Sequence, residues 1–309
     1  MEVKAKFLKA AKVLKNSFQL FKNHDTWTLG AALSYYTAFS IAPVLIIVIS
    51  IAGMILGPEA ITGEIKKQVQ SFMGPQGAKD LQDIIRAAYK PGENWIATII
   101  AIVLLIVGST SVFDQMRTSL NVIWDVKPAA KKPVLKFLLN RLFSFAMIVC
   151  LGFLLLISFV LNALLSGFTA YLNQWLPDIS VVLMKVLEVA VSYVLTATLF
   201  AFVYKFMSDA RLQWRNVWAG AAFTAVLFAL GKYLIGIYIG NSNLADTYGA
   251  AASVIMVLVW VFYSSQIVFF GAEFTRALAV ERGVSLDPKA IKPDKEAGIV
   301  GKQVVEKKK

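Results

Sequence analysis

The sequence predicts an all-α polytopic membrane protein: a bundle of six transmembrane helices with an amphipathic N-terminal helix and a helical external loop. Three observations lead to this fold class. The 309-residue chain is 58% hydrophobic and only 16% charged, whereas a soluble domain carries about 25% charged residues. Apolar stretches long enough to cross the hydrocarbon core of a bilayer occupy residues 34–56, 95–113, 142–165, 179–204, 217–240 and 251–275. The third observation is the placement of lysine and arginine between these stretches.

Basic residues alternate between the two sides of the predicted bundle. The N-terminal segment, the second and fourth connections and the C-terminal tail are basic, whereas the third and fifth connections contain no lysine or arginine. The first connection, 57–94, balances its basic residues with equally many acidic ones. Because cytoplasmic loops retain positive charge, this alternation predicts that both termini are cytoplasmic. The first stretch is too long for a cleaved signal sequence, so we expect the protein to stay in a cytoplasmic membrane.

The N-terminal segment, residues 1–26, has the pattern of a basic amphipathic helix. Its lysines alternate with apolar residues that recur at helical spacing: Phe7, Leu8, Ala11, Leu14, Phe18 and Phe21. Such a helix binds the surface of an anionic leaflet, so we expect contact with lipids of the inner leaflet. A helix packed under the bundle is the alternative interpretation.

Residues 27–280 form the predicted transmembrane domain. Pro43 lies well inside its first span, where a proline removes a backbone donor and kinks or breaks the helix. The external loop, 57–94, contains two segments with apolar residues at spacings of three and four, next to Gly-Pro pairs. We expect two short amphipathic helices over the outer face, and the pattern is compatible with a lid as well as with a structural cap.

Charged residues inside the fourth and fifth spans form the first candidate site, because an ionisable group at this depth is a functional hypothesis by default. Lys232 lies deep in the fifth span, and Glu188 lies at a similar depth in the fourth. We hypothesise that they form an ion pair lining an interior cavity, with a purely structural interhelical pair as the alternative. Lys185 lies nearer the outer end of its span, where its side chain can extend to the surface.

Polar residues near the cytoplasmic ends of the spans form the second candidate site. They lie at comparable depth and would make an inner polar gate, or would fix helix ends as ordinary interfacial residues: Asp114, Arg117, Asn121, Asn140, Arg141 and Glu273. For Glu273, an i,i+3 pair with Arg276 is a simple local explanation.

The chain has no recognisable catalytic or metal-binding constellation. Cys150 is its single cysteine and His24 its single histidine, too few for an internal disulfide, a zinc site or a Ser-His-Asp centre. P-loop, HExxH, paired CxxC and GxSxG motifs do not occur in the sequence. We therefore expect no cofactor, and the sequence favours a protein that is not an enzyme.

The partners expected from the sequence are membrane lipids. The net charge of +12 belongs to the loops and tails that topology already places in the cytoplasm, so we expect no nucleic acid. A GxxxG pattern at Gly236 and Gly240 allows close helix packing, within the bundle or between subunits of a homo-oligomer. Residues 281–309 are predicted to be a disordered, basic cytoplasmic tail.

Four segments resemble a known family. They are AALSYYTAFSIAP (31–43), SLNVIW (119–124), NRLFSF (140–145) and YGAAASVIMVLVWVFYSSQIVFFGAEF (248–274). Through them the chain is similar to the YihY/BrkB family of bacterial inner-membrane proteins over nearly all of residues 20–280. The resemblance implies six spans with both termini inside, in agreement with the charge pattern.

The function expected from these features is transporter-like, in the handling of lipids or anionic solutes. The predicted break at Pro43 and the charged residues within several spans motivate it, and Lys232 and Lys185 would suit an anionic ligand. A non-transporting scaffold of the cell envelope is the alternative. The family has also carried the name ribonuclease BN, which implies processing of tRNA, although the residues offer nothing to activate water at a phosphate.

Overall fold

The computed structural model describes residues 2–56, 62–63, 95–126, 177–240 and 252–284, together with isolated positions 142, 146, 147, 149, 153, 157 and 248. The regular elements of this part of the chain are α-helices: α1 (Glu2–Asn23), α2 (Thr26–Leu56), α4 (Trp95–Ile123), α6 (Pro177–Phe206), α7 (Trp214–Gly240) and α9 (Ala252–Glu281). The predicted all-α class is confirmed for the described residues. Most of the predicted external loop, third span and C-terminal tail lies outside them.

Three described helices are long and apolar enough to cross a membrane. They cover Lys185–Phe206 in α6, Trp214–Tyr238 in α7 and Val254–Glu281 in α9, which correspond to the fourth, fifth and sixth predicted spans. The helices α2 and α4 have 31 and 29 residues, although many of their side chains lie outside the described set. The count of six spans stays a prediction.

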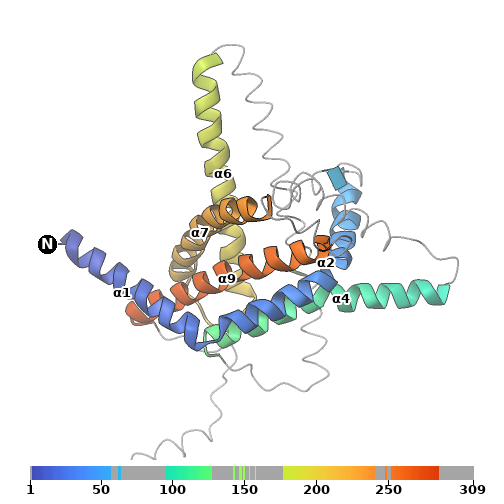
Figure 1. Cartoon of the computed structure of the whole chain (residues 1–309), viewed down its shortest axis with the longest axis horizontal. Coiled ribbons are helices and arrows are strands. Elements are labelled where there is room, and N and C mark those ends of the chain that lie inside the picture. Colours follow the sequence, from blue (N-terminus) through green and yellow to red (C-terminus); the bar gives the residue numbers. More distant parts are fainter. Residues whose placement is uncertain are drawn as a thin grey trace, which may run out of the picture.

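The helix α9 occupies the centre of the described bundle. It contacts α1, α2 and α4 as well as α7, and Figure 1 shows it between α7 and the α1–α2 pair. Other helix pairs in contact include α2 with α4, α6 with α7 and α1 with α2. Residues on α9 therefore face most of the described helices, and α9 is the element from which a site shared by several helices can be built.

The main apolar core is built mostly from α4, α6, α7 and α9, with Phe21 of α1 and Leu33 of α2 added at its side. Its fully buried members include Leu120, Ile123, Trp124, Ala201, Tyr204, Val217, Ala221, Phe269 and Ala272. Tyr204 links three helices, because its hydroxyl donates to the backbone oxygen of Val268 at 2.7 Å and lies 2.9 Å from Oγ1 of Thr224. Gly271 allows this approach, since a Cβ at that position would overlap Oγ1 of Thr224.

The first helix both packs on the bundle and leaves apolar residues uncovered. Val13, Ser17 and Phe21 are buried, and α1 contacts α9 along this length. Leu8 and Phe18 are more than half exposed, at 61% and 53%. The packed interpretation of this segment is thus seen in the structure, while the lipid contact expected for it stays a prediction.

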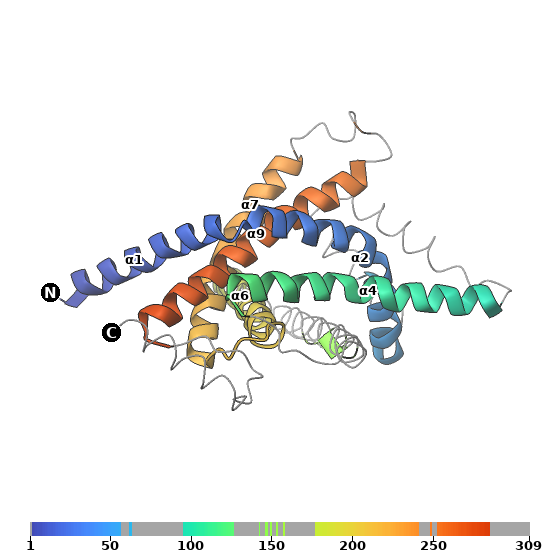
Figure 2. The same ribbon diagram turned by 90° about the horizontal axis from the view of Figure 1, so that it is seen from below.

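Position 43 lies within α2, which is continuous from Thr26 to Leu56. Figures 1 and 2 show that the ribbon of α2 changes direction along its length. The side chain of Pro43 lies outside the described set, and its assignment as the break point stays a prediction.

Candidate functional site

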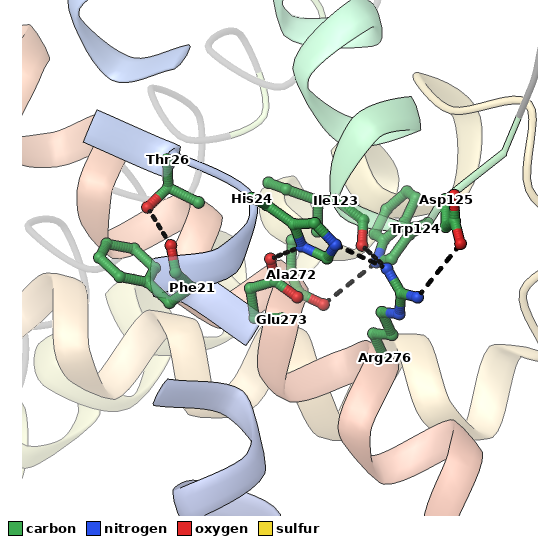
Figure 3. A network of polar contacts seen from close by, with 9 residues as sticks. All are labelled: Phe21, His24, Thr26, Ile123, Trp124, Asp125, Ala272, Glu273 and Arg276. Atoms are coloured by element: carbon green, nitrogen blue, oxygen red, sulfur yellow. Dashed lines mark hydrogen bonds and ion pairs between the residues drawn. The ribbon is translucent and has the colours of Figure 1, made fainter. Parts of the chain in front are cut away.

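A tight turn between α1 and α2 places His24 against α9. Asp25 adopts a left-handed backbone conformation, with φ of 47°, which aspartate tolerates better than most residues. The backbone N–H of Asp25 donates to the oxygen of Lys22 at 3.3 Å. The hydroxyl of Thr26 donates to the oxygen of Phe21 at 2.9 Å, which satisfies a carbonyl that the end of α1 leaves free. Figure 3 shows the resulting direction of His24 toward Glu273.

The end of α4 brings a second group of residues to the same place. Asp125 is also left-handed, with φ of 54°. Its N–H donates to the oxygen of Val122 at 3.0 Å, and the N–H of Val126 donates to the oxygen of Asn121 at 2.9 Å, the pair of bonds that defines a Schellman helix end. This ending holds Trp124 in the core, where Nε1 donates to the oxygen of Ala272 at 3.1 Å.

A buried carboxyl–imidazole pair lies at the junction of these segments. Oε1 of Glu273 is 2.6 Å from Nδ1 of His24, and the Glu273 side chain is fully buried, with 0% exposure. Its second oxygen, Oε2, is also buried and has no hydrogen-bond partner among the described residues. An unpaired buried carboxyl oxygen is unfavourable, so Oε2 of Glu273 is an energetically costly feature of this site.

Arg276, one turn after Glu273 on α9, joins the pair to α4. Nη1 of Arg276 donates to the backbone oxygen of Ile123 and lies 3.3 Å from Nε2 of His24. Its Nη2 is 3.7 Å from the exposed carboxylate of Asp125. We call the set His24, Asp125, Glu273 and Arg276 the His24 cluster (Figure 3).

The guanidinium fixes the position of the proton on His24. Arginine donates hydrogen bonds and accepts none, so Nε2 of His24 must be the acceptor in its contact with Arg276. The single proton of the neutral ring is then on Nδ1, which donates to Glu273. Burial and the charge of Arg276 lower the pKa of His24 below its ordinary value, against an opposing effect of Asp125. The geometry and the electrostatics therefore both favour the neutral imidazole.

A second polar group, which we call the Arg117 cluster, joins α4 to the connection between α6 and α7. Arg117 forms a two-pronged ion pair with Asp209, whose closer contact joins Nη2 to Oδ1. Asn121, one turn further along α4, donates from Nδ2 to Oδ2 of Asp209 at 3.0 Å. Its Oδ1 accepts from the backbone N–H of Asp209 at 2.9 Å. Asp209 is thus held by both residues.

The structure brings together part of the predicted inner gate. Arg117 and Asn121 meet through Asp209, and Glu273 belongs to the neighbouring His24 cluster. Asp114 is half-buried on α4, and its backbone oxygen accepts from the hydroxyl of Thr118. Asn140 and Arg141 lie outside the described residues. For Glu273, the short contact in the structure is the hydrogen bond with His24, which joins distant segments, and the local pair expected with Arg276 stays a prediction.

The predicted cavity pair is only partly described. Lys232 on α7 and Lys185 on α6 are exposed, and the side chain of Glu188 lies outside the described set. The Lys232–Glu188 ion pair and the cavity that it would line stay predictions.

Sequence reasoning missed Asp209 and underestimated His24. Asp209 is an acidic residue in an otherwise basic connection between two spans, and this isolated opposite charge was a usable signal. His24 is the single histidine of the chain and lies in the segment before the first predicted span. Its partner is 249 positions away, a distance that sequence patterns do not bridge.

Both clusters lie at the same end of the bundle. The contacts His24–Glu273, Arg117–Asp209 and Arg282–Asn216 gather the α1–α2 turn, the end of α4, the α6–α7 connection and the end of α9. The α6–α7 connection and the start of α7 also expose basic and aromatic side chains together: Arg211, Trp214, Arg215 and Trp218. This mixture is typical of a membrane–water interface.

Comparisons with known proteins agree on a membrane protein. A family model described as Virulence factor BrkB matches residues 17–296. The chain is similar to proteins described as UPF0761 membrane protein. The one from Alcanivorax borkumensis is 27% identical over 253 residues, which cover 81% of this chain and 56% of that protein.

A second relative, from Chromohalobacter salexigens, is 27% identical, with coverage of 87% of this chain and 63% of the relative. One from Alteromonas mediterranea is 24% identical, with coverage of 90% and 92%. The chain therefore spans only 56% and 63% of the length of the first two relatives. No solved structure matches it significantly.

Proposed function

The chain belongs to the Virulence factor BrkB family of membrane proteins, and from that premise we propose that it is a transporter-like protein that handles an anionic solute or lipid headgroup. Its place is the cytoplasmic membrane of a bacterium, with both termini in the cytoplasm. The two polar clusters form the inner gate. Six transmembrane helices surround the pathway.

The observation that carries this proposal is the concentration of charged groups between helices at one end of the bundle. The Arg117–Asp209 pair is only about a quarter exposed, at 25% and 21%, and Glu273 is fully buried. Placing a charged residue between helices in a membrane costs free energy, and such residues therefore usually have a functional role. Each cluster joins segments that are far apart in the sequence, so exchanging its partners would change how those segments pack.

The gate interpretation explains why the contacts are polar rather than apolar. A well-packed hydrophobic contact would hold the helix ends at least as firmly as an ion pair. Hydrogen-bonded pairs can instead exchange partners with water or with a ligand. In this mechanism Arg117 and Asn121 release Asp209, and the α6–α7 connection moves away from α4. Arg117 then becomes accessible to an anion.

An anionic ligand is favoured by the charges in the same region. Lys185 and Lys232 lie on the adjacent spans α6 and α7, and Lys232 is the residue expected to face Glu188 in an interior cavity. Arg117 and Arg276 lie at the inner end. A phosphate-bearing headgroup or a small anion would meet cationic side chains both within the spans and at the inner end, since guanidinium and ammonium groups bind phosphate oxygens well.

The first helix fits a role at the anionic inner leaflet. Its exposed apolar residues Leu8, Leu14 and Phe18 are flanked by the exposed lysines Lys9 and Lys15, and a basic amphipathic helix gains free energy from both types of contact at an anionic surface. In this position α1 lies in the plane of the interface while its other face holds α9. The GxxxG residue Gly236 is exposed on α7 and would suit a contact between subunits.

The experiment measures flux in proteoliposomes with two probes, a fluorescent phosphatidylglycerol analogue and radiolabelled phosphate. The analogue reports handling of a lipid headgroup, and phosphate reports handling of a free anion. We expect one of them to move with the wild type and to move several-fold more slowly with Lys232→Ala. A neutral substitution of exposed Gln213 is the matched control. Equal rates for Lys232→Ala and wild type would remove Lys232 from the pathway.

The gate is tested by locking it. Cysteines replace Asn121 and Asp209 in a Cys150→Ser background, and a short bifunctional maleimide links them. We expect the link to stop flux, while each single cysteine treated in the same way retains it. Undiminished flux in the linked protein would contradict the gate. If neither probe moves with folded wild type, the transport proposal fails and the envelope scaffold becomes the better account.

A further inference from the structure

The inner gate as proposed makes no use of the most unusual atom in the site, Oε2 of Glu273. This oxygen is buried and has no hydrogen-bond partner among the described residues, while Oε1 of the same carboxyl is only 2.6 Å from His24. A carboxylate with one hydrogen-bonded oxygen and one oxygen without a partner can bind one proton at the second oxygen. The competing position for this proton is Nε2 of the His24 imidazole.

Entry at the imidazole would break an existing contact. The free nitrogen of His24 is Nε2, which lies 3.3 Å from Nη1 of Arg276. Protonation would turn Nε2 into a donor that faces another donor and would place two positive charges in contact. The guanidinium is itself fixed by the backbone oxygen of Ile123, so Arg276 cannot turn away without losing that bond.

Entry at Oε2 of Glu273 breaks nothing. The bond from Nδ1–H of His24 to Oε1 remains, and so does the contact between Nε2 and Arg276. The added proton neutralises a charge in a fully buried position, which burial favours. Among the buried acceptors of the cluster, the vacant oxygen of Glu273 is therefore the one left open.

Among the described residues, titratable and charged groups reach the Glu273–His24 pair and the neighbouring part of α9 from several elements. His24 comes from the α1–α2 turn, Arg276 lies one turn further on α9, and Asp125, at the end of α4, contacts Arg276 at 3.7 Å. Near the end of α9, Glu281 pairs with Lys12 of α1 at 3.2 Å. Of the helices α7 and α2, the described close approaches to α9 include Thr224, which faces Gly271, and Gly30, which faces Ser265 and Gln266.

We infer that Glu273 and His24 form a reversible proton-binding site, in which the proton enters at Oε2 of Glu273, and that this proton is the ion coupled to transport. The second half of the inference rests on the proposed function. In the loaded state Glu273 is neutral, with Oε1 as a carbonyl oxygen that accepts from His24. In the empty state its carboxylate is balanced by Arg276. Loading and release therefore change the net charge at the contact between α9 and the α1–α2 turn by one unit.

Infrared difference spectroscopy of the full chain in lipid nanodiscs tests the binding site. Lowering the pH should produce the C=O stretch of a protonated carboxyl, and this band should be lost in Glu273→Gln. Glu281→Gln, a substitution of the carboxyl on the same helix that pairs with Lys12, is the matched control and should keep the band. In His24→Leu the band should persist at higher frequency, because Oε1 loses its hydrogen bond. The absence of the band in wild type, or its persistence unchanged in Glu273→Gln, overturns the site.

Flux of the phosphatidylglycerol analogue and of phosphate, with and without a pH gradient across the vesicles, tests the coupling. We expect the wild-type rate of the transported probe to change several-fold with the gradient and the Glu273→Gln rate to lose that dependence. A wild-type flux that is the same with and without the pH gradient would contradict the proton coupling and leave the transport proposal intact. If neither probe moves, the transport proposal fails and the coupling fails with it, whereas the infrared band still decides whether the proton site exists.

Discussion

Replacing Gly271 by alanine should weaken the bundle, because α9 meets α6 and α7 at that position with no space for a methyl group. The new Cβ would overlap Oγ1 of Thr224 and crowd the hydroxyl of Tyr204. Neither group can move freely. Oγ1 of Thr224 donates to the oxygen of Gly220 at 2.7 Å, and the hydroxyl of Tyr204 donates to Val268 at 2.7 Å.

The magnitude follows from these contacts. Overpacking of a filled core costs about 1–3 kcal/mol, and each hydrogen bond that Tyr204 loses adds about 1 kcal/mol. The gain in helix propensity from glycine to alanine offsets up to about 1 kcal/mol. We expect Gly271→Ala to lower the unfolding free energy by roughly 2–4 kcal/mol.

The assay is SDS-induced unfolding in mixed micelles, followed by tryptophan fluorescence. Gly236→Ala on α7 is the matched control, since a Cβ at Gly236 meets nothing within 4 Å; its effect should stay within about 1 kcal/mol, on the stabilising side. Thr224→Ala added to Gly271→Ala makes room for the methyl group, so the two losses should be less than additive. A Gly271→Ala protein as stable as the wild type would refute the reasoning.

Three further predictions concern the clusters and the helix ends. In a double-mutant cycle, Arg117→Ala and Asp209→Ala should be coupled by about 1–3 kcal/mol, whereas independent effects would mean that the pair contributes no mutual stability. Asp125→Gly should stabilise the protein by up to about 1 kcal/mol, because glycine adopts the left-handed conformation without penalty and the exposed contact with Arg276 contributes little; a loss of stability measured by the same SDS titration would contradict this. The pKa of His24 is lowered in the folded protein, so as the pH falls the unfolded chain binds a proton on this residue first. The contribution of neutral His24 to the unfolding free energy is therefore fully present above the ordinary pKa of 6.5 and is lost as the pH decreases through that value. In a Glu273→Gln background, where that carboxyl no longer titrates, unfolding titrations below this value should show a loss of up to about 1.4 kcal/mol per pH unit, and adding His24→Gln should remove it; an unchanged slope would show that His24 is not the group responsible.

Composition and charge predicted the helices well because long apolar segments in a membrane have few alternatives to the helix. The predicted fourth, fifth and sixth spans, 179–204, 217–240 and 251–275, overlap α6, α7 and α9 almost completely. The ends were less accurate. The apolar stretch that begins α4 stops at 113, yet the helix continues to Ile123, since hydropathy marks only the part of a helix that is apolar and not the polar turns that follow.

The sequence allowed single residues of the candidate site to be predicted, but not the contacts between them. Arg117, Asn121 and Glu273 could be selected because polar residues near a predicted span end are few. Their partners could not, because Asp209 and His24 reach them through contacts between segments far apart in the chain. Helical periodicity relates residues three or four positions apart; it carries no information on which helices lie side by side.

The account depends most directly on which side of the membrane holds the two clusters. Single cysteines at Gln213, an exposed residue of the α6–α7 connection, and at Asp246, in the predicted external connection, are introduced separately into a Cys150→Ser chain. Spheroplasts are then treated with a membrane-impermeant maleimide. We predict that the cysteine at 246 reacts in intact spheroplasts and that the one at 213 reacts only after permeabilisation. The reverse pattern would place the His24 and Arg117 clusters outside the cell and contradict the proposed inner gate.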